Sequence, residues 1–428
     1  MCIDRMKIEN ASTINYGKLI ATKRIEMNIT QEELAKGICS IPYLSKIENG
    51  KIYANPDIIY LLCEKLNLSC SELEENNNEV ILLIQELFTS INEDDETLSK
   101  ELWDKLEQYS ESFYNPEVSI YYDLIEMRYH IYIKNLRRAE QIGKKLDRIC
   151  KTLNNDQLFY YHYFIGLLFL HKQNYMEGIN SFKKALPYRQ LASSRDYHII
   201  YYLSLSYSHM KRPSLAIQFG LEALTFFQEN LNYNRIIECY ILIGFNYARI
   251  KQFNEAYNLY EKVLRLTKKN KDDKTTGKVY HNMGYLYSMQ NDHESAIKYY
   301  KKSLKLKSEN DPMYHHTLYY LAKEYLKIKN EFLALSCIEK GLQSPANNKA
   351  NLIKLTVLKL FIIANTEQYI NYLKDEAIPY FKEKNDFPTL AKYYEYLGDL
   401  YSENYFYYKK STYYYKQALK LKKGSDLW

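Results

Sequence analysis

Side chains able to do chemistry are abundant in this 428-residue sequence, but their spacing does not suit catalysis. The sequence has no G-x-S-x-G, G-x-G-x-x-G or H-E-x-x-H motif, and the Gly-Lys of TTGKVY lacks the other residues of a P-loop. His315 and His316 are neighbours, so their rings point in different directions on a helix. The seven cysteines are scattered, without a C-x-x-C pair or zinc-ligand spacing. We therefore expect no catalytic residues, no cofactor and no metal, and a function based on binding.

The elements that position the remaining polar and aromatic side chains are predicted to be helices. Gly (13) and Pro (9) are scarce, which argues against sandwiches, barrels and Rossmann folds. No apolar run approaches the ~18 residues that a membrane helix needs. The N-terminal MCIDRMKIEN lacks the apolar segment of a signal peptide. We predict an all-α cytoplasmic protein that does not act at a membrane.

Charge divides the chain into three segments. Residues 1–68 are close to neutral, residues 69–119 carry 14 acidic and 2 basic side chains, and residues 120–428 carry 47 basic and 30 acidic ones. Such a shift indicates domain boundaries. We predict a small N-terminal domain (1–72), an acidic linker with a first helical hairpin (73–119), and a large C-terminal domain (120–428).

Residues 15–68 have the start and stop signals of several short helices. A first helix is predicted in NYGKLIATKRIEM, from its apolar spacing. Thr30 and Glu33 form a predicted capping box for a second helix, which ends at Gly37. Ser40 caps a third helix, IPYLSKIE, and PDIIYLLCEKLNL follows as a fourth. Two short helices joined by a tight turn indicate a helix-turn-helix.

The string ITQEELAKGICSIPYLSKIENGK resembles the phage-repressor-like (XRE-type) DNA-binding domain. The resemblance implies that residues 41–49 form the recognition helix, which enters the major groove. The chain departs from the family pattern in a turn that is one residue shorter, and in an Ile-Pro pair that can contact a thymine methyl but forms no bidentate hydrogen bond. The alternative is a bundle kept only for structure or oligomerisation. By position, the implied DNA contacts are Gln31, Ser40 and Tyr43 at phosphates, Ile41, Pro42 and Lys46 at bases, and Lys23, Arg24 and Lys51 as further phosphate contacts.

A second pattern repeats through residues 120–428. A small residue is followed by Tyr three positions later, by Ala nine after that, and by an aromatic residue four later, as in Gly284, Tyr287, Ala296 and Tyr300. Equivalent small residues recur at a period of 40, and a last unit, marked by Gly398, is one residue out of step. This resembles the tetratricopeptide repeat, in which small residues let paired helices approach closely. The resemblance implies about eight hairpins in a right-handed superhelix with a concave groove.

In tetratricopeptide repeats the groove is lined by the first helix of each pair. A carboxamide such as Asn282 can hydrogen-bond to the backbone of an extended peptide, and Lys278, Lys323 or Arg249 can neutralise a C-terminal carboxylate. Ordinary surface or packing roles remain open for each of these residues. The implied peptide-binding residues are Arg128, Tyr202, His209, Arg249, Lys278, Asn282, Tyr285, Tyr320 and Lys323.

The two halves together resemble the Firmicute peptide-sensing quorum regulators of the RRNPP family, closest to its NprR/PlcR-like branch. The resemblance implies a homodimeric transcriptional regulator, with higher assembly on ligand binding left open, whose groove binds a short signalling peptide and which binds a double-stranded DNA operator. An alternative is a protein-interaction inhibitor that sequesters a response regulator of a sporulation-type phosphorelay, with DNA binding secondary. A third alternative is a repeat scaffold for another partner.

Overall fold

The computed structural model describes residues 6, 8, 16–109, 115–191, 196–344, 349–363, 366–384, 386–403 and 407–426. These residues form helices joined by short turns, and none of them lies in a strand, as expected for an all-α chain. No helix within these ranges is both long and apolar enough to cross a membrane. The chain divides into two compact units, Met1–Leu242 and Ile243–Trp428.

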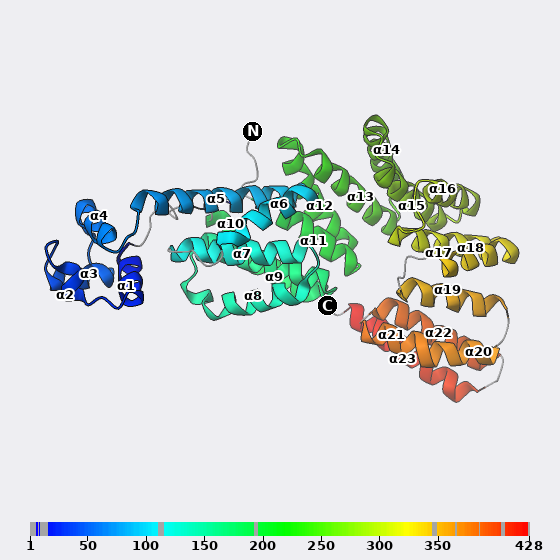
Figure 1. The fold of residues 1–428 in the computed structure, drawn as a ribbon. Helices are drawn as coiled ribbons and strands as arrows, with labels where there is room; N and C mark the ends of the chain where they lie inside the picture. The colour runs from blue at the N-terminus through cyan, green and yellow to red at the C-terminus, as the bar shows by residue number, and fades with distance from the viewer. Residues whose placement is uncertain are drawn as a thin grey trace. The chain divides into compact units, whose positions relative to one another are not determined.

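Four short helices at the N-terminus form a bundle with its own core (Figure 1). Ile20, Leu34, Leu44, Ile47 and Leu62 are buried together at its centre, one or two from each helix. Burial of this apolar surface stabilises the bundle, because its helices are too short to be stable alone. The four helices are α1 (Tyr16–Glu26), α2 (Gln31–Ala35), α3 (Ile41–Glu48) and α4 (Pro56–Lys65).

Antiparallel helix pairs follow along the rest of the chain, and they confirm the predicted repeat architecture. The first hairpin is α5 (Cys70–Asn92) with α6 (Glu96–Leu106), and eight further hairpins follow within the described residues. The pairs are α7 (Pro116–Tyr132) with α8 (Leu136–Arg148), α9 (Asn155–His171) with α10 (Tyr175–Leu191), α11 (His198–His209) with α12 (Pro213–Glu229), α13 (Tyr233–Arg249) with α14 (Phe253–Asn270), α15 (Asp273–Met289) with α16 (His293–Lys305), α17 (Pro312–Lys327) with α18 (Glu331–Gln343), α19 (Lys349–Ile362) with α20 (Thr366–Tyr372) and α21 (Ile378–Glu383), and α22 (Phe387–Glu403) with α23 (Tyr408–Asp426).

The small residue and the aromatic residue of the repeat pattern face each other within a hairpin. A Cβ atom at Gly244 would lie 2.8 Å from the ring of Tyr260. Gly398 approaches the ring of Tyr415 at the same 2.8 Å, which confirms the predicted one-residue offset of the last unit. Glycine is needed at these positions because any side chain would separate the two helices.

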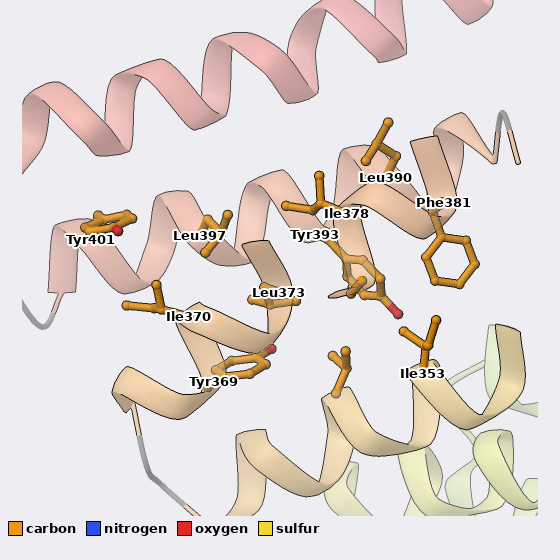
Figure 2. Close-up of a cluster of buried hydrophobic side chains, with 12 residues drawn as sticks. Ile353, Tyr369, Ile370, Leu373, Ile378, Phe381, Leu390, Tyr393, Leu397 and Tyr401 are labelled. Carbon is orange, nitrogen blue, oxygen red and sulfur yellow. The ribbon is translucent and has the colours of Figure 1, made fainter. Parts of the chain in front are cut away.

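The last two hairpins share one apolar core. Figure 2 shows side chains from α19, from the segment α20–α21 and from α22 turned toward one another, including Ile353, Leu373, Phe381, Tyr393 and Leu397. These residues are almost completely buried. The repeat pattern of the sequence is degenerate in α19–α21, so packing of these apolar side chains defines the hairpin there.

Helix α5 is continuous from Cys70 to Asn92, so it crosses the predicted domain boundary between residues 72 and 73. It begins directly beyond the four-helix bundle and ends in the first hairpin. Exposed acidic side chains such as Glu74, Glu75 and Glu79 lie on this helix, which is the first of the predicted hairpin.

Candidate nucleic-acid and peptide interfaces

Local capping positions the recognition helix α3. Thr30 accepts a hydrogen bond from the backbone of Glu33, while the Glu33 carboxylate accepts one from Thr30 N at 2.8 Å, so the predicted capping box is confirmed. The Ser40 hydroxyl accepts a hydrogen bond from Tyr43 N, as predicted for the N-cap of α3. Gly37 and Gly50 have positive φ angles of 81° and 63°, which close the two turns around α3. Both turns depend on a left-handed conformation that favours glycine.

The exposed face of α3 carries the residues expected at DNA bases. Ile41, Pro42 and Lys46 are exposed, and Tyr43 is half-buried against the core of the bundle. Lys51, in the turn after α3, is also exposed. An apolar patch beside an ammonium group can meet a thymine methyl and a base acceptor at one edge of the major groove.

Arg24 and Gln31 bond to a buried carboxylate instead of projecting into solvent. The Arg24 guanidinium donates to Glu48 at 2.7 and 3.0 Å and to the Ile29 carbonyl at 3.0 Å. The Gln31 amide donates to the same carboxylate at 2.6 Å. These donors are engaged within the bundle. Arg24 is therefore not proposed to contact a phosphate, and the side-chain amide group of Gln31 already donates to Glu48. Lys23 pairs with Glu26 at 3.2 Å on the surface, where such a pair breaks at little cost.

Lys65 has a role that the sequence did not indicate. Its ammonium group donates to the carbonyls of Glu33, Leu34 and Lys36, at 2.7, 3.2 and 2.9 Å. These carbonyls end α2, where no intrahelical donor is present. The last turn of α4 therefore holds the turn between α2 and α3.

Helix α5 contacts the four-helix bundle at one end and the repeats at the other (Figure 1). At its start, Leu73 packs against Leu19, and the Tyr16 hydroxyl donates to Glu74 at 2.7 Å. At its end, the backbone carbonyl of Asn92 accepts a hydrogen bond from Arg235 at 3.1 Å. One rigid helix thus connects α1 of the DNA-binding bundle to α13 of the repeats.

Two predicted peptide-binding residues, Arg128 and Tyr202, lie in a polar cluster of the first unit. Arg128 is buried and donates to the Asn92 side chain at 3.4 Å. Asp196 is also buried and accepts from the His198 backbone N–H at 2.8 Å. Burial raises the pKa of Asp196, but the charge and hydrogen bonds of His198, with Arg128, outweigh it and hold that pKa below its ordinary value.

The ring of Tyr202 lies 6.1 Å from that of Tyr163, beside this cluster. Within the described residues, Asp196 Oδ2, Tyr163 OH and Asn92 Nδ2 are buried without a hydrogen-bond partner. Buried polar atoms of this kind can bond to the backbone of an extended peptide. His209 lies at the far end of α11, exposed, with its ring stacked on Tyr175 at 4.4 Å.

The second unit brings together four of the other predicted residues. The Arg249 guanidinium lies 4.3 Å from the centre of the Phe245 ring and hydrogen-bonds to Tyr285, and burial lowers the pKa of Arg249. The rings of Tyr285 and Tyr320 are 6.3 Å apart, edge to face. The Lys323 ammonium lies 5.6 Å from the centre of the Tyr320 ring. Asn282 is half-buried on the same helix as Tyr285, while Lys278 is exposed one turn before it.

Two histidines of this region were not among the predicted residues. His281 hydrogen-bonds to Thr317 at 3.0 Å, and its ring lies 5.0 Å from that of His316. The His316 ring in turn lies 4.9 Å from that of Tyr320. Burial, helped by the nearby ammonium groups of Lys354 and Lys307, lowers the pKa of His316 to about 4.

A signal for these residues was present in the repeat register. His316 precedes the small residue Ala322 by the same interval at which Lys278 precedes Gly284 and Lys392 precedes Gly398. The register therefore places His316, Lys278 and Lys392 at one position of the first helices. No comparable signal exists for Lys354, because α19 lacks the small-residue marker. The described part of the chain holds no group of three or more His, Cys, Asp or Glu side chains suited to a metal ion.

Both halves of the chain match known families. Residues 20–73 match a helix-turn-helix family and residues 235–309 match a tetratricopeptide-repeat family. The transcriptional activator NprA of Geobacillus stearothermophilus is 28% identical over 91% of this chain and 99% of its own length. The apo form of the quorum sensor NprR from B. thuringiensis superposes with a TM-score of 0.67, at 26% identity, over 80% of this chain and 99% of the NprR chain. Over most of its length the chain is similar to regulators of the NprR-like branch of the RRNPP family.

The chain is also similar to the Rap proteins. Regulatory protein RapD of Bacillus subtilis (strain 168) is 22% identical over 65% of this chain and 86% of its own length. These similarities confirm the resemblance drawn from the helix-turn-helix strings and the repeat register.

Proposed function

We propose that this chain is a DNA-binding transcriptional regulator whose repeats bind a short signalling peptide, and that the peptide changes how two copies sit on an operator. The observation that carries this proposal is the similarity to NprR over 98% of the NprR chain in its solved complex with its cognate peptide NprX (25% identity, TM-score 0.65). Alongside it stands a helix-turn-helix with intact caps and an exposed recognition face.

DNA binding is supported by the chemistry of α3 and its surroundings. Ser40, Tyr43 and Lys51 surround the exposed Ile41–Lys46 face, so phosphate contacts can fix the helix while its first turn reads base edges. The bundle is close to neutral overall, which makes the affinity of one copy modest. We therefore propose a homodimer that engages two half-sites.

Peptide binding is supported by two clusters on, or directly before, the first helices of the hairpins. Asn92, Arg128, Tyr163 and Asp196 offer donors and acceptors to a peptide backbone in the first unit. Arg249, Tyr285, Tyr320 and Lys323 offer aromatic surface and positive charge in the second. Tyr side chains give a large contact area at low entropic cost.

A regulatory role in the cytoplasm, where the DNA lies, follows from this proposal, and we propose that the chain is not an enzyme. The activator NprA and the quorum sensor NprR are regulators by name. Some relatives of lower identity are named response regulator aspartate phosphatases, such as the E protein of Bacillus subtilis at 24% over 55% of this chain. Their names motivate a second candidate function.

The second candidate is capture of a response regulator by the repeats, with DNA binding secondary. The similarity to this phosphatase-named relative, which extends over about half of this chain, supports the second candidate. The acidic faces of α5 and α6 offer a surface of opposite charge to a basic partner. In this candidate, variants of α3 leave the activity of the chain unchanged.

A mobility-shift assay on the DNA upstream of the chain's own gene separates the two candidates. The assay uses the full chain, with and without the peptide encoded by a small secreted reading frame beside the gene. We expect a shift that the peptide changes and that Tyr43→Ala combined with Lys46→Ala abolishes, while peptide binding of this variant is retained. No shift under either condition rules out the regulator proposal and leaves response-regulator capture to be tested by co-purification.

A further inference from the structure

Three lysines from three successive hairpins of the second unit are half-buried, and the charge of one of them acts on the other two. Lys323 is on α17, Lys354 on α19 and Lys392 on α22, and all three are half-buried. The Lys392 ammonium lies within hydrogen-bonding reach of Lys323 and also acts electrostatically on Lys354. Bringing three ammonium groups together is unfavourable unless an anion neutralises them.

The nearby carboxylates provide only part of that neutralisation. Asp386 lies 3.8 Å from Lys354, and its two oxygens also cap α22 through the backbone and hydroxyl of Thr389, at 3.2 and 2.7 Å. Glu324, next to Lys323 in sequence, is directed to the other side of α17. There its oxygens accept hydrogen bonds from Ser288 and Lys327 at 2.7 and 2.9 Å, and one of them lies 2.8 Å from His293 Nδ1.

The pKa values of Lys323 and Lys354 are lowered, as expected where positive charges lie close together. Burial, together with the nearby ammonium groups of Lys392 and Lys327, lowers the pKa of Lys323 to about 8, against the opposing effect of Glu324. Burial also lowers the pKa of Lys354, against the opposing effect of Asp386. The cluster therefore holds more desolvated positive charge than its own carboxylate balances.

Aromatic rings surround these ammonium groups. Lys323 lies 5.7 and 5.6 Å from the ring centres of Tyr319 and Tyr320, and Lys392 lies 5.3 Å from that of Tyr396. Tyrosine supplies apolar area on its faces and a hydroxyl donor at its edge. Ammonium groups between tyrosine rings are suited to a planar carboxylate attached to a short chain.

We infer that Lys323, Lys354 and Lys392 form a carboxylate-binding subsite that holds one end, or one acidic side chain, of the peptide bound by the repeats. This inference rests on the proposed peptide-binding function and adds a chemical requirement for the peptide. Two sources of carboxylate satisfy it, namely a free C-terminus and an Asp or Glu side chain. It extends the predicted role of Lys323 to two lysines on α19 and α22 that the repeat resemblance left unassigned.

The test uses the full chain, immobilised, and a mixed-sequence heptapeptide library made both as free acids and as C-terminal amides. Retained peptides are identified by mass spectrometry. A preference for free acids identifies the C-terminus as the source, whereas a preference for Asp or Glu among the amides identifies a side chain. We expect Lys323→Gln and Lys392→Gln each to reduce this preference about tenfold, the size expected for one charge-assisted hydrogen bond.

Lys327→Gln is the matched control, because Lys327 is on the same helix but pairs with Glu324. It should keep the preference of the unaltered chain. Unfolding midpoints of the three variants verify that each remains folded. Equal retention of amidated peptides that lack Asp and Glu overturns the inference while leaving the peptide-binding function in place.

A second measurement covers the case in which no library peptide is retained. Reductive methylation of lysines is followed by mass spectrometry in the presence of millimolar N-acetylglycine, with N-acetylglycinamide as the uncharged control. We expect N-acetylglycine alone to protect Lys323 and Lys354, and not Lys327. Protection without library retention upholds the subsite and contradicts the peptide-binding proposal, whereas no protection overturns the subsite.

Discussion

A Cβ atom on Gly284 would lie 2.6 Å from the ring of Tyr300, sixteen positions later in the next helix. Tyr300 is completely buried, so its ring has no space into which to move. This contact fixes the separation of α15 and α16, and the same relationship recurs between Gly244 and Tyr260. The small and aromatic residues of the repeat pattern therefore mark the positions where the two helices of a pair approach most closely.

Replacement of Gly284 by alanine should destabilise the second unit. We expect a loss of about 1–3 kcal/mol from overpacking against Tyr300, which exceeds the gain of ~1 kcal/mol from better helix propensity. Gly277→Ala is the control on the same helix, since its Cβ would lie at an ordinary 3.4 Å from Leu306. Urea unfolding should show a lower midpoint for Gly284→Ala and an equal or higher one for Gly277→Ala. Equal midpoints for both variants would contradict the packing argument.

Arg24→Met should destabilise the four-helix bundle. The change leaves the Glu48 carboxylate, whose side chain is only 5% exposed, without its cationic partner. We expect a cost of about 3 kcal/mol, as for other buried ion pairs broken on one side. Hydrogen exchange of the α1–α3 amides, followed by mass spectrometry of the full chain, measures this loss.

The surface pair of Lys23 and Glu26 provides the comparison for Arg24. Lys23→Met should cost less than about 1 kcal/mol, because that pair is exposed. Combining Arg24→Met with Glu48→Leu should recover much of the lost protection, since no charge then remains buried. Exchange in Arg24→Met no faster than in Lys23→Met would show that Arg24 is not needed inside the bundle.

Lys46 and Lys51 should affect DNA binding differently. Lys46, on the exposed face of α3, is placed to contact a base, so Lys46→Ala should cost about 1–3 kcal/mol on the upstream DNA of its own gene and much less on random DNA. Lys51, beyond the helix, is proposed to contact a phosphate. Lys51→Ala should weaken binding to both DNAs and reduce the salt dependence by about one ion per copy. Fluorescence anisotropy over a range of salt concentrations distinguishes these outcomes, and identical behaviour of the two variants would contradict the assignment.

Acid should destabilise the second unit through His316. Its pKa falls from 6.5 in an unperturbed chain to about 4 in the folded protein, because of burial and the ammonium groups of Lys354 and Lys307. Between pH 6.5 and about 4, the unfolded chain binds a proton on His316 that the folded chain does not bind. The stability contributed by neutral His316 is therefore present above pH 6.5 and lost as pH falls toward 4. The loss amounts to at most about 3 kcal/mol.

The measurement compares urea unfolding of the unaltered chain with that of His316→Gln at several pH values. His281, on α15, faces His316 and titrates in the same direction, so part of the pH dependence should remain in the variant. His209→Gln is the control, because His209 is exposed on α11. An unchanged pH dependence in His316→Gln would show that His316 is not held neutral by the fold.

Features that depend on local sequence were predicted correctly. The capping box of Thr30 and Glu33, the cap at Ser40 and the turn at Gly50 involve residues three or four apart, so the sequence alone contains the whole interaction. The helix pairs were predicted because the small and aromatic residues recur with a fixed spacing. The resemblance to the RRNPP family followed from the same two patterns.

Features that depend on contacts between distant residues were missed. Glu48 is far from Arg24 in sequence, and nothing near Arg24 marks it as an interior residue rather than a phosphate contact. Lys65 bonds to carbonyls of α2, and backbone carbonyls leave no signal in a sequence. Lys354 lies on a helix without the small-residue marker, so only its packing against Phe381 and its contact with Asp386 reveal its neighbours.

Because α5 is one unbroken helix, the number of residues in it determines the rotation of the DNA-binding bundle about the helix axis. Each residue of an α-helix turns the chain by about 100° and advances it by about 1.5 Å. Leu73 and Glu74 contact α1 at one end of this helix, and the Asn92 carbonyl accepts a hydrogen bond from Arg235 at the other. A single residue inserted between these anchors would rotate the bundle by more than a quarter turn while lengthening the molecule hardly at all. In the proposed homodimer, two recognition helices rotated in this way would face different sides of the double helix, so the residue count of α5 would set the half-site spacing that the pair can read.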